Sequence, residues 1–432
     1  MTDDVRTVRI GMLGCGTVGS AVARTLDEHR DDIARRAGIR LEIARVAVRN
    51  IDKPRDVPLA QEVFTTDGVS IVDDPAIDVV LELLGGIEPA RVIVLRALGN
   101  GKPAVSGNKE LLANAGAELE DGAAAAGVDL AYEAAVAGGI PLIRPLRESL
   151  AGDRVTRMLG IVNGTTNYIL TQMSEHGWGF AQALAEAQAL GYAEADPTAD
   201  VEGFDAAAKC AILASIAVDA HVTIDDVFRE GITSVTADDI ADAHRLGYVI
   251  KLLAIAELDA GAISVRVHPA MVPVAHPLAS VRDVYNAVFI EADKAGRLMF
   301  YGRGAGGDPT ATSVIGDLIR VGRHVAFGGR PQSMDGRMPE RPVRPMADAH
   351  GQYYLNLHVE DRPGVLAEIA EVFGRNGVSI ERVFQEGAGD EASLVFITHR
   401  AREGAFQATL AELRERRSVR AVESLLRVEG DE

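Results

Sequence analysis

Residues 8–19 read Val-Arg-Ile-Gly-Met-Leu-Gly-Cys-Gly-Thr-Val-Gly, and the expected fold of the first third of the chain follows from them. Val8–Leu13 is a short apolar run typical of a buried strand, and residues 20–29 have helical spacing. The glycines between them follow the pattern G-x-G-x-x-G, with the strand before it and the helix after it. This context predicts an α/β fold with a Rossmann-type dinucleotide-binding domain.

Each position of this turn has an expected role. Gly14 makes the tight turn, Gly16 lets the backbone approach a pyrophosphate, and Gly19 lets the helix pack on the strand. Thr17 and Val18 lie within the turn, and the N–H groups and partial positive charge at the N-terminus of the helix that follows favour bound phosphates. We therefore expect the cofactor to contact the whole turn.

The next predicted strand, Leu41–Val48, follows a basic and polar segment that we expect to be a helix or loop. After it comes Arg49-Asn50-Ile51-Asp52-Lys53, not an acidic residue that would hold a ribose 2′-hydroxyl. Arg49, helped by Lys53, suits a 2′-phosphate, so NADP is predicted over NAD. The alternative is that both are solvated loop charges, and Arg49 lies beyond the usual ~20 residues after the glycines.

Further strand candidates end in small or polar residues. Ile77–Leu84 ends in a Gly-Gly pair, and Pro103–Ser106 ends in Gly107-Asn108-Lys109. Because ligands of an open α/β sheet lie outside the carboxyl ends of its strands, we expect Lys109 to reach the nicotinamide or the substrate. A surface lysine at a helix start is the alternative. Val128–Tyr132 predicts another strand, and the turn after it offers carbonyls that a hard cation could use together with Glu133.

The pattern changes from about Arg154, which predicts a second domain. Its expected elements are a strand at Arg154–Val162, helices from Asn163 and at Phe180–Leu190, an Ala-rich helix at Asp205–Val218, a long helical stretch at Asp238–Leu258, and strands near Ala262–Val272 and Asn286–Glu291. Phe300–Gly307 is expected to be a second Gly-rich turn that returns the chain to the cofactor, followed by a helix at Thr310–Val321. Thr and Asn at the helix start after Val162 have a structural explanation as caps.

The stretch 191–213 places charge in an apolar setting. Asp205 and Lys209 are four residues apart and share a helix face, while Ser215 is the only other polar residue up to Val218. A helix this apolar is usually buried, which predicts Lys209 at the mouth of a pocket, where it can donate a proton. An exposed ion pair is the alternative. Glu194 and Asp200 add acceptors for a substrate ammonium, although turn chemistry explains such carboxylates equally well.

Composition limits the classes of function. The length of 432 residues predicts two or three domains. The net charge of −19 and the absence of a Lys/Arg cluster with interleaved aromatics argue against nucleic acid as a partner. Cys15 and Cys210 lie in apolar surroundings, which predicts reduced thiols in a cytoplasmic protein. The sequence shows no signal peptide and no run near the roughly 18 apolar residues of a membrane span, so we expect no membrane partner.

The last hundred residues predict a small separate domain. Pro331–Met346 is rich in Pro and Arg and predicts a linker. Beyond it the expected order is βαββαβ, with strands at Tyr353–Val359, Ser379–Glu386, Ser393–Thr398 and Ala421–Val428 and helices at Gly364–Asn376 and Glu403–Arg416.

With these residues in view, the chain resembles homoserine dehydrogenases that carry a C-terminal ACT domain. The resemblance covers essentially the whole chain. It rests on Gly14–Gly19, Ser106–Lys109, Asn163–Asn167, Gly191–Pro197 with Asp205 and Lys209, and Gly304–Gly306. The block from Glu194 to Lys209 is the specific one. In the last domain the resemblance rests on Asp361–Leu366 and Asn376–Ile380, a pattern shared by many amino-acid-sensing domains.

The resemblance implies reversible, NADPH-dependent reduction of L-aspartate 4-semialdehyde to L-homoserine, on the route to threonine, methionine and isoleucine, with NAD(H) as a second possible cofactor. It makes Lys209 the proton donor, with Lys109 close to the reacting group, and leaves their division of work open. Glu194, Asp200 and Asp205 would position the amino acid. Ser106 and Gly306 join the residues expected at the cofactor.

The resemblance also implies a sodium ion, an effector and an assembly. The sodium ligands would be Glu133 and the carbonyls of Val136, Gly138 and Ile140. The ACT domain would bind an amino acid, with L-threonine as the usual effector, near Asp361, Gly364 and Asn376. Such domains pair, which predicts a homo-oligomer, a dimer or a tetramer. The alternative is an ACT domain that serves assembly only.

The predicted organisation has four segments, namely an NADP-binding Rossmann domain at 1–135 with 301–330 returning to it, a catalytic and dimerisation domain at 136–300, a linker at 331–350, and an ACT regulatory domain at 351–432. Two other functions compete. A different ACT-containing dehydrogenase would lack the Glu194–Lys209 block and would need a catalytic histidine. A catalytically dead NADPH or amino-acid sensor would have no need of both Lys109 and Lys209.

Overall fold

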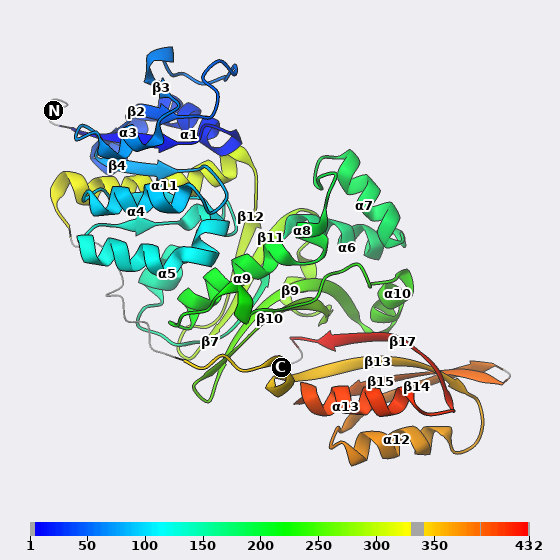
Figure 1. The fold of residues 1–432 in the computed structure, drawn as a ribbon. Coiled ribbons are helices and arrows are strands. Elements are labelled where there is room, and N and C mark those ends of the chain that lie inside the picture. Colours follow the sequence, from blue (N-terminus) through cyan, green and yellow to red (C-terminus); the bar gives the residue numbers. More distant parts are fainter. Residues whose placement is uncertain (1–4, 330–340, 389, 431–432) are drawn as a thin grey trace. The chain divides into compact units, whose positions relative to one another are not determined.

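The computed structural model describes residues 5–329, 341–388 and 390–430 of the chain (Figure 1). Residues 331–340, the first half of the predicted linker at 331–350, lie outside the described residues. The chain forms two compact units. The first comprises residues 1–158, 208–226 and 285–341, and the second comprises 159–207, 227–284 and 342–432.

The first unit contains a six-stranded sheet in the order β3-β2-β1-β4-β5-β6, and every pairing in it is parallel (Figure 1). Its strands are β1 (Arg6–Leu13), β2 (Ile39–Ala47), β3 (Phe64–Thr65), β4 (Val79–Glu82), β5 (Ala104–Ser106) and β6 (Leu130–Ala131). The connecting helices are α1 (Thr17–Glu28), α2 (Arg30–Ala37), α3 (Gly68–Asp73), α4 (Ala90–Gly99) and α5 (Lys109–Ala126). The order reverses between β1 and β4, where dinucleotides bind in such sheets. The Rossmann-type prediction is confirmed.

The core of this sheet explains why β1 is so apolar. Ile10, Met12 and Leu13 are fully buried because helices cover both faces of a parallel sheet. The returning helix α11 (Gly307–Phe327) packs into the same core as α1, with Val314 and Leu318 among its buried side chains. The core of the first unit is therefore formed by residues near the start of the chain together with residues of α11.

A second set of strands in this unit has the order β12-β11-β7, with β7 (Val155–Ile161), β11 (Tyr285–Ala292) and β12 (Gly296–Arg303). The predicted Gly-rich turn at Phe300–Gly307 is wrong in its first half. Phe300 pairs with Val288 and Tyr301 with Ala287 in an antiparallel ladder, so only residues 304–306 turn. The ladder satisfies the backbone groups of β12, which local glycine content does not reveal.

The second unit begins with helices α6 (Gly164–His176), α7 (Phe180–Ala189), α8 (Thr198–Val201) and α10 (Ala237–Leu246), with α9 (Phe204–Ala217) starting in it. Its strands include β8 (Phe228–Arg229), β9 (Tyr248–Asp259) and β10 (Ala262–Pro273). The long helix predicted for Asp238–Leu258 is wrong beyond Leu246. Gly247, with φ +86°, ends α10, and β9 then pairs with β10 along its whole length. A fully buried apolar run fits a strand or a helix equally well by periodicity.

The last domain has the predicted βαββαβ order. Its elements are β13 (His350–Glu360), α12 (Val365–Arg375), β14 (Ile380–Ala388), β15 (Glu391–Thr398), α13 (Glu403–Arg414) and β17 (Val419–Val428), with a two-residue β16 (Ala401–Arg402). The sheet order is β17-β13-β15-β14, and both helices lie on one face of it (Figure 1). Their apolar faces meet the sheet around Phe373, Phe396 and Phe406.

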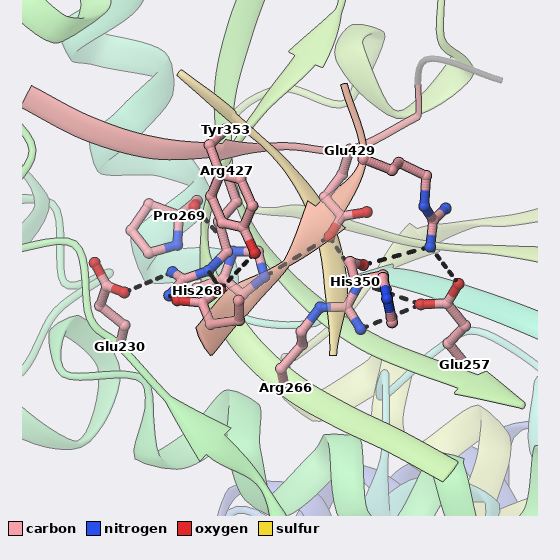
Figure 2. A network of polar contacts seen from close by, with 11 residues as sticks. Glu230, Glu257, Arg266, His268, Pro269, His350, Tyr353, Arg427 and Glu429 are labelled. Carbon is pink, nitrogen blue, oxygen red and sulfur yellow. Dashed lines mark hydrogen bonds and ion pairs between the residues drawn. The ribbon is translucent and has the colours of Figure 1, made fainter. Parts of the chain in front are cut away.

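Strand β17 also pairs with β10, where Ala270 aligns with Arg427. A buried ionic network surrounds this junction (Figure 2). Arg427 donates two hydrogen bonds to Glu403, at 3.0 and 2.9 Å, and one to Glu230 at 2.8 Å. Arg266 donates to Glu429 at 2.8 Å. The C-terminal strand is therefore fixed to β10 by backbone pairing and by charge-assisted hydrogen bonds.

His268 lies inside this network, is fully buried, and donates from Nδ1 to the Pro269 carbonyl at 3.0 Å (Figure 2). Burial, aided by the positive charge of Arg427, lowers the pKa of His268 to about 3. Because the unfolded chain accepts a proton near pH 6.5 that the folded chain refuses, the free energy of unfolding should fall as pH falls from about 6.5 towards 3. Urea titrations across that range should give a shallower pH dependence for His268→Leu, and parallel curves would contradict this.

Candidate functional site

A cavity of about 340 Å³ lies at the carboxyl ends of β1, β4 and β5. It is lined by three turns, Gly16–Gly19, Leu83–Gly86 and Gly107–Glu110. Gly14 has φ +97°, and a Cβ there would lie 2.5 Å from the carbonyl oxygen of Leu83. A Cβ at Gly16 would meet nothing within 4 Å, so the backbone is open to a ligand at that point. The predicted turn therefore has the shape of a phosphate cradle at the start of α1.

The turn before α11 comes close to the first turn of α1. A Cβ at Gly307 would lie 3.3 Å from Thr17 Cγ2, and Gly306 has φ +120° as the residue that caps α11. The structure thus places Gly306 beside the residues of the glycine-rich turn. Arg49 and Lys53 are exposed in the segment after β2, the strand next to β1.

Sequence reasoning missed Glu82, which lies at the end of β4 and is fully buried. It accepts hydrogen bonds from Ser106 Oγ at 2.6 Å and from Asn108 Nδ2 at 3.2 Å. Burial raises the pKa of Glu82, and these donors oppose the rise. Asn108 also caps α5, so this carboxyl group fixes the turn from which Lys109 projects. The only sequence signal was an acidic residue inside an apolar strand.

In the second unit Asn163 brings two predicted carboxylates together. Its Nδ2 donates to Asp200 at 2.6 Å and to Asp205 at 2.9 Å, while its Oδ1 accepts from the Thr166 N–H as the cap of α6. The capping role expected for this motif is therefore real, but the same side chain also holds the carboxylates. Glu194 is exposed and lies outside this hydrogen-bonded cluster.

Lys209 lies one turn after Asp205 on α9, a helix whose alanines at 206, 207 and 208 are buried. Its own side chain is half-buried. Helices α5 and α9 line one small cavity of about 70 Å³ in the first unit, with Leu112 and Ile212 among its lining residues. Lys109 and Lys209 each precede one of these residues by three positions.

Glu133 is buried in the turn after β6, where its carboxylate accepts the N–H groups of Leu142 at 2.5 Å, Ile143 at 2.7 Å and Arg144 at 2.9 Å. A second buried carboxylate, Asp317, accepts the N–H of Glu133 at 2.8 Å. Of the three predicted carbonyl ligands at Val136, Gly138 and Ile140, that of Gly138 accepts a hydrogen bond from Ser313 at 2.6 Å. Among the described residues, no cluster of three His, Cys, Asp or Glu suits a metal ion.

The predicted effector residues lie at both ends of α12. Asp361 and Gly364 precede the helix, whereas Asn376 follows it and donates to the Val372 carbonyl at 3.0 Å and to Glu412 at 3.2 Å. An eleven-residue helix is about 16 Å long. One small ligand within a single domain therefore cannot contact all three residues.

The parallel sheet and its glycine-lined cavity define an NAD(P)-dependent oxidoreductase of the class that acts on CH–OH groups. Residues 14–133 match the family described as homoserine dehydrogenase, NAD binding domain, residues 141–319 match homoserine dehydrogenase, and residues 353–417 match the ACT domain. The chain belongs to the homoserine dehydrogenase family.

Individual relatives cover from 73% to 98% of this chain. The homoserine dehydrogenase of Corynebacterium glutamicum is 49% identical over 429 residues, covering 98% of this chain and 96% of that protein. The crystal structure of a homoserine dehydrogenase from Thiobacillus denitrificans has a TM-score of 0.92 at 40% identity, covering 98% of this chain and 99% of that one. A hyperthermophilic archaeal homoserine dehydrogenase in complex with NADPH has a TM-score of 0.60 at 28% identity, covering 73% of this chain and 98% of its own. Within the part of this chain that the structure describes, no helix is both long and apolar enough to cross a membrane.

Proposed function

We propose that this chain catalyses the reversible, NADPH-dependent reduction of L-aspartate 4-semialdehyde to L-homoserine, with Lys209 as proton donor. The observation that carries the assignment of residues is that Asn163 holds the carboxylates of Asp200 and Asp205, and that Asp205 lies one helix turn before Lys209. Two carboxylates suit the ammonium of an amino acid, and a lysine suits the oxygen of its aldehyde.

The residues of the first unit fit a nicotinamide dinucleotide. The N-terminus of α1 and the open backbone at Gly16 would hold the pyrophosphate, and Ser106 and Gly306 would lie along its edge. Arg49 and Lys53 would hold a 2′-phosphate, which favours NADP over NAD. The archaeal relative in complex with NADPH supports a nicotinamide cofactor. When bound, NADPH supplies the hydride that reduces the aldehyde carbon.

The chain's own groups then act on the substrate oxygen. Reduction leaves negative charge on that oxygen, and the Lys209 ammonium stabilises and protonates it. Asp200 and Asp205 hold the substrate ammonium, with Glu194 as a further acceptor. Lys109, at the start of α5 beside the cofactor cavity, would act next to the reacting group.

We further propose a structural sodium ion at Glu133 and the carbonyls of Val136, Gly138 and Ile140. Two buried carboxylates, Glu133 and Asp317, concentrate negative charge there, and a carbonyl oxygen that accepts one hydrogen bond keeps a second lone pair. Glu133 already accepts three N–H groups, so the ion would add to a formed turn and not create it.

The ACT domain supports regulation by a pathway amino acid, with L-threonine as the proposed effector. Because Asp361 and Asn376 lie at opposite ends of α12, a site using both would need ACT domains from two copies, which supports a homo-oligomer. The domain limits that we propose are 1–135 with 301–330 for the NADP-binding domain, 136–300 for the catalytic and dimerisation domain, 331–350 for the linker and 351–432 for the ACT domain. Two buried free thiols, Cys15 and Cys210, support a cytoplasmic location.

The test is the absorbance of reduced nicotinamide during incubation with L-homoserine and NADP. We expect steady reduction of NADP, dependence on sodium when it is replaced by a bulky organic cation, and a response to added L-threonine that is lost when residues beyond 350 are removed. A chain that binds NADPH but never turns over L-homoserine would instead support the sensor alternative.

A further inference from the structure

Lys251 is a buried lysine that the proposed chemistry does not use. It lies on β9 with 4% of its surface exposed. Its Nζ donates to Asn167 Oδ1 at 3.1 Å and to the Val281 carbonyl at 2.5 Å. Burial lowers the pKa of Lys251 to about 8, and nearby Glu175 opposes that fall. At neutral pH the ammonium therefore keeps all its N–H donors.

Asn167 receives this hydrogen bond within the first turns of α6. It is 1% exposed, and its Nδ2 donates to the carbonyls of Val281 at 3.3 Å and Asp283 at 2.9 Å. Asn163, the cap that holds the two carboxylates, lies four residues earlier, one turn along the same helix. Because only one helical turn separates the two residues, a displacement of Asn167 should also displace the cap residue Asn163.

The segment at 281–284 contacts the start of α6. A Cβ at Gly164 would lie 2.9 Å from the Val284 carbonyl oxygen, so this segment touches the first residue of the helix. The Asp283 N–H donates to Thr171 Oγ1 at 3.2 Å, two turns further on. The helix start is thus held between its carboxylate partners and a loop that Lys251 anchors.

The strand that carries Lys251 lies on a fixed support. Lys251 pairs with Ala270 of β10, and Ala270 pairs in turn with Arg427 of β17. The buried ion pair of Arg266 on β10 with Glu429, the residue after β17, joins these two strands (Figure 2). The backbone position of Lys251 is therefore set by the pairing of β9 in the sheet and not by its contact with α6.

We propose that Lys251 is a positioning residue for the substrate: through Asn167 it fixes helix α6, whose cap residue holds the two carboxylates. The inference rests on the proposed function, which assigns those carboxylates to the substrate ammonium. It adds a residue that touches neither substrate nor cofactor and lies outside every motif of the sequence.

The test compares Lys251→Met with the wild-type chain. We expect the KM for L-homoserine to rise about 10–100-fold with a smaller change in kcat, since a small misplacement of binding groups costs about that much. The dissociation constant of NADPH, measured by nicotinamide fluorescence, should be unchanged. Amide hydrogen exchange should become faster at residues 164–168. Lys251→Arg, which keeps N–H donors, should recover part of the KM.

Lys102→Met is the matched control, because Lys102 is also buried, has its pKa lowered by burial, and donates to a carbonyl, that of Asp74 in the first unit. It should lower the melting temperature without changing the KM. Asn167→Ala should reproduce the KM of Lys251→Met, and the double variant should be no worse than either, because both act through one contact.

A Lys251→Met chain with wild-type KM and unchanged exchange in α6 would overturn the inference, even if its melting temperature falls as in the control. If Lys251→Met does not fold, Asn167→Ala alone decides by the same two readouts. A wild-type chain that fails to oxidise L-homoserine refutes the proposed function, whereas the exchange measurement still reports whether Lys251 anchors α6.

Discussion

Lys209→Ala is expected to lower kcat by about 10²–10⁴-fold, because it removes the group that protonates and stabilises the oxygen as hydride arrives at the carbon. Lys209 lies on α9 one turn after Asp205, where the buried alanine face fixes the helix. The dissociation constant of NADPH should not change, because the lysine does not belong to the turns that line the cofactor cavity. Stopped-flow absorbance and nicotinamide fluorescence separate the two effects.

Lys209→Arg sharpens this experiment. Arginine keeps the positive charge but does not release its proton near neutral pH, so substrate binding should survive better than kcat. Lys109→Ala, measured in parallel, assigns the roles of the two lysines. A large loss of kcat in Lys109→Ala together with a retained kcat in Lys209→Ala would show that the proton comes from the start of α5.

Arg49→Ala is expected to weaken NADPH by about 10–150-fold, the equivalent of the ~1.5–3 kcal/mol that hydrogen bonds to a charged group contribute. NADH, which lacks the 2′-phosphate, should bind nearly as before. Arg49 is exposed after β2, so the side chain is available to a ligand and its loss should not disturb the core.

The control for this prediction is Arg40→Ala, since Arg40 is exposed near the start of β2 whereas Arg49 follows the end of that strand. It should leave both affinities unchanged. Equal weakening of NADPH and NADH by Arg49→Ala would contradict a contact to the 2′-phosphate, and would instead indicate a general electrostatic effect of a basic loop on a chain of net charge −19.

Sequence predictions were reliable where a local pattern has a single structural solution. The strand and glycine turn at residues 8–19 require φ +97° at Gly14 and a helix immediately after, and both are present. The alternating strands after residue 350 gave the correct βαββαβ order. The sequence predictions failed at Asp238–Leu258, where a buried strand and a buried helix have the same apolar composition, and at Phe300–Arg303, where a glycine, Gly302, lies within a paired strand.

The candidate site shows the same division. The types of residue at Asp200, Asp205 and Lys209 were evident from the chain, because charge in an apolar helix needs a reason. Their arrangement was not evident, because it depends on Asn163, whose capping role was a sufficient local explanation. Glu82 was missed for a related reason: an acidic residue within a strand has meaning only when its hydrogen-bond donors, Ser106 and Asn108, are known.

By itself the sequence determined the nucleotide-binding fold, the order of elements in the last domain and the residue types of the chemistry, because these depend on spacing along one chain. Only the folded structure shows that Asn163 joins two carboxylates, that the backbone at Arg427 pairs with β10, and that Lys251 donates a hydrogen bond to Asn167 of α6. Those contacts join residues from 37 to more than 150 positions apart, and no local pattern encodes a hydrogen bond whose partner comes from another part of the chain.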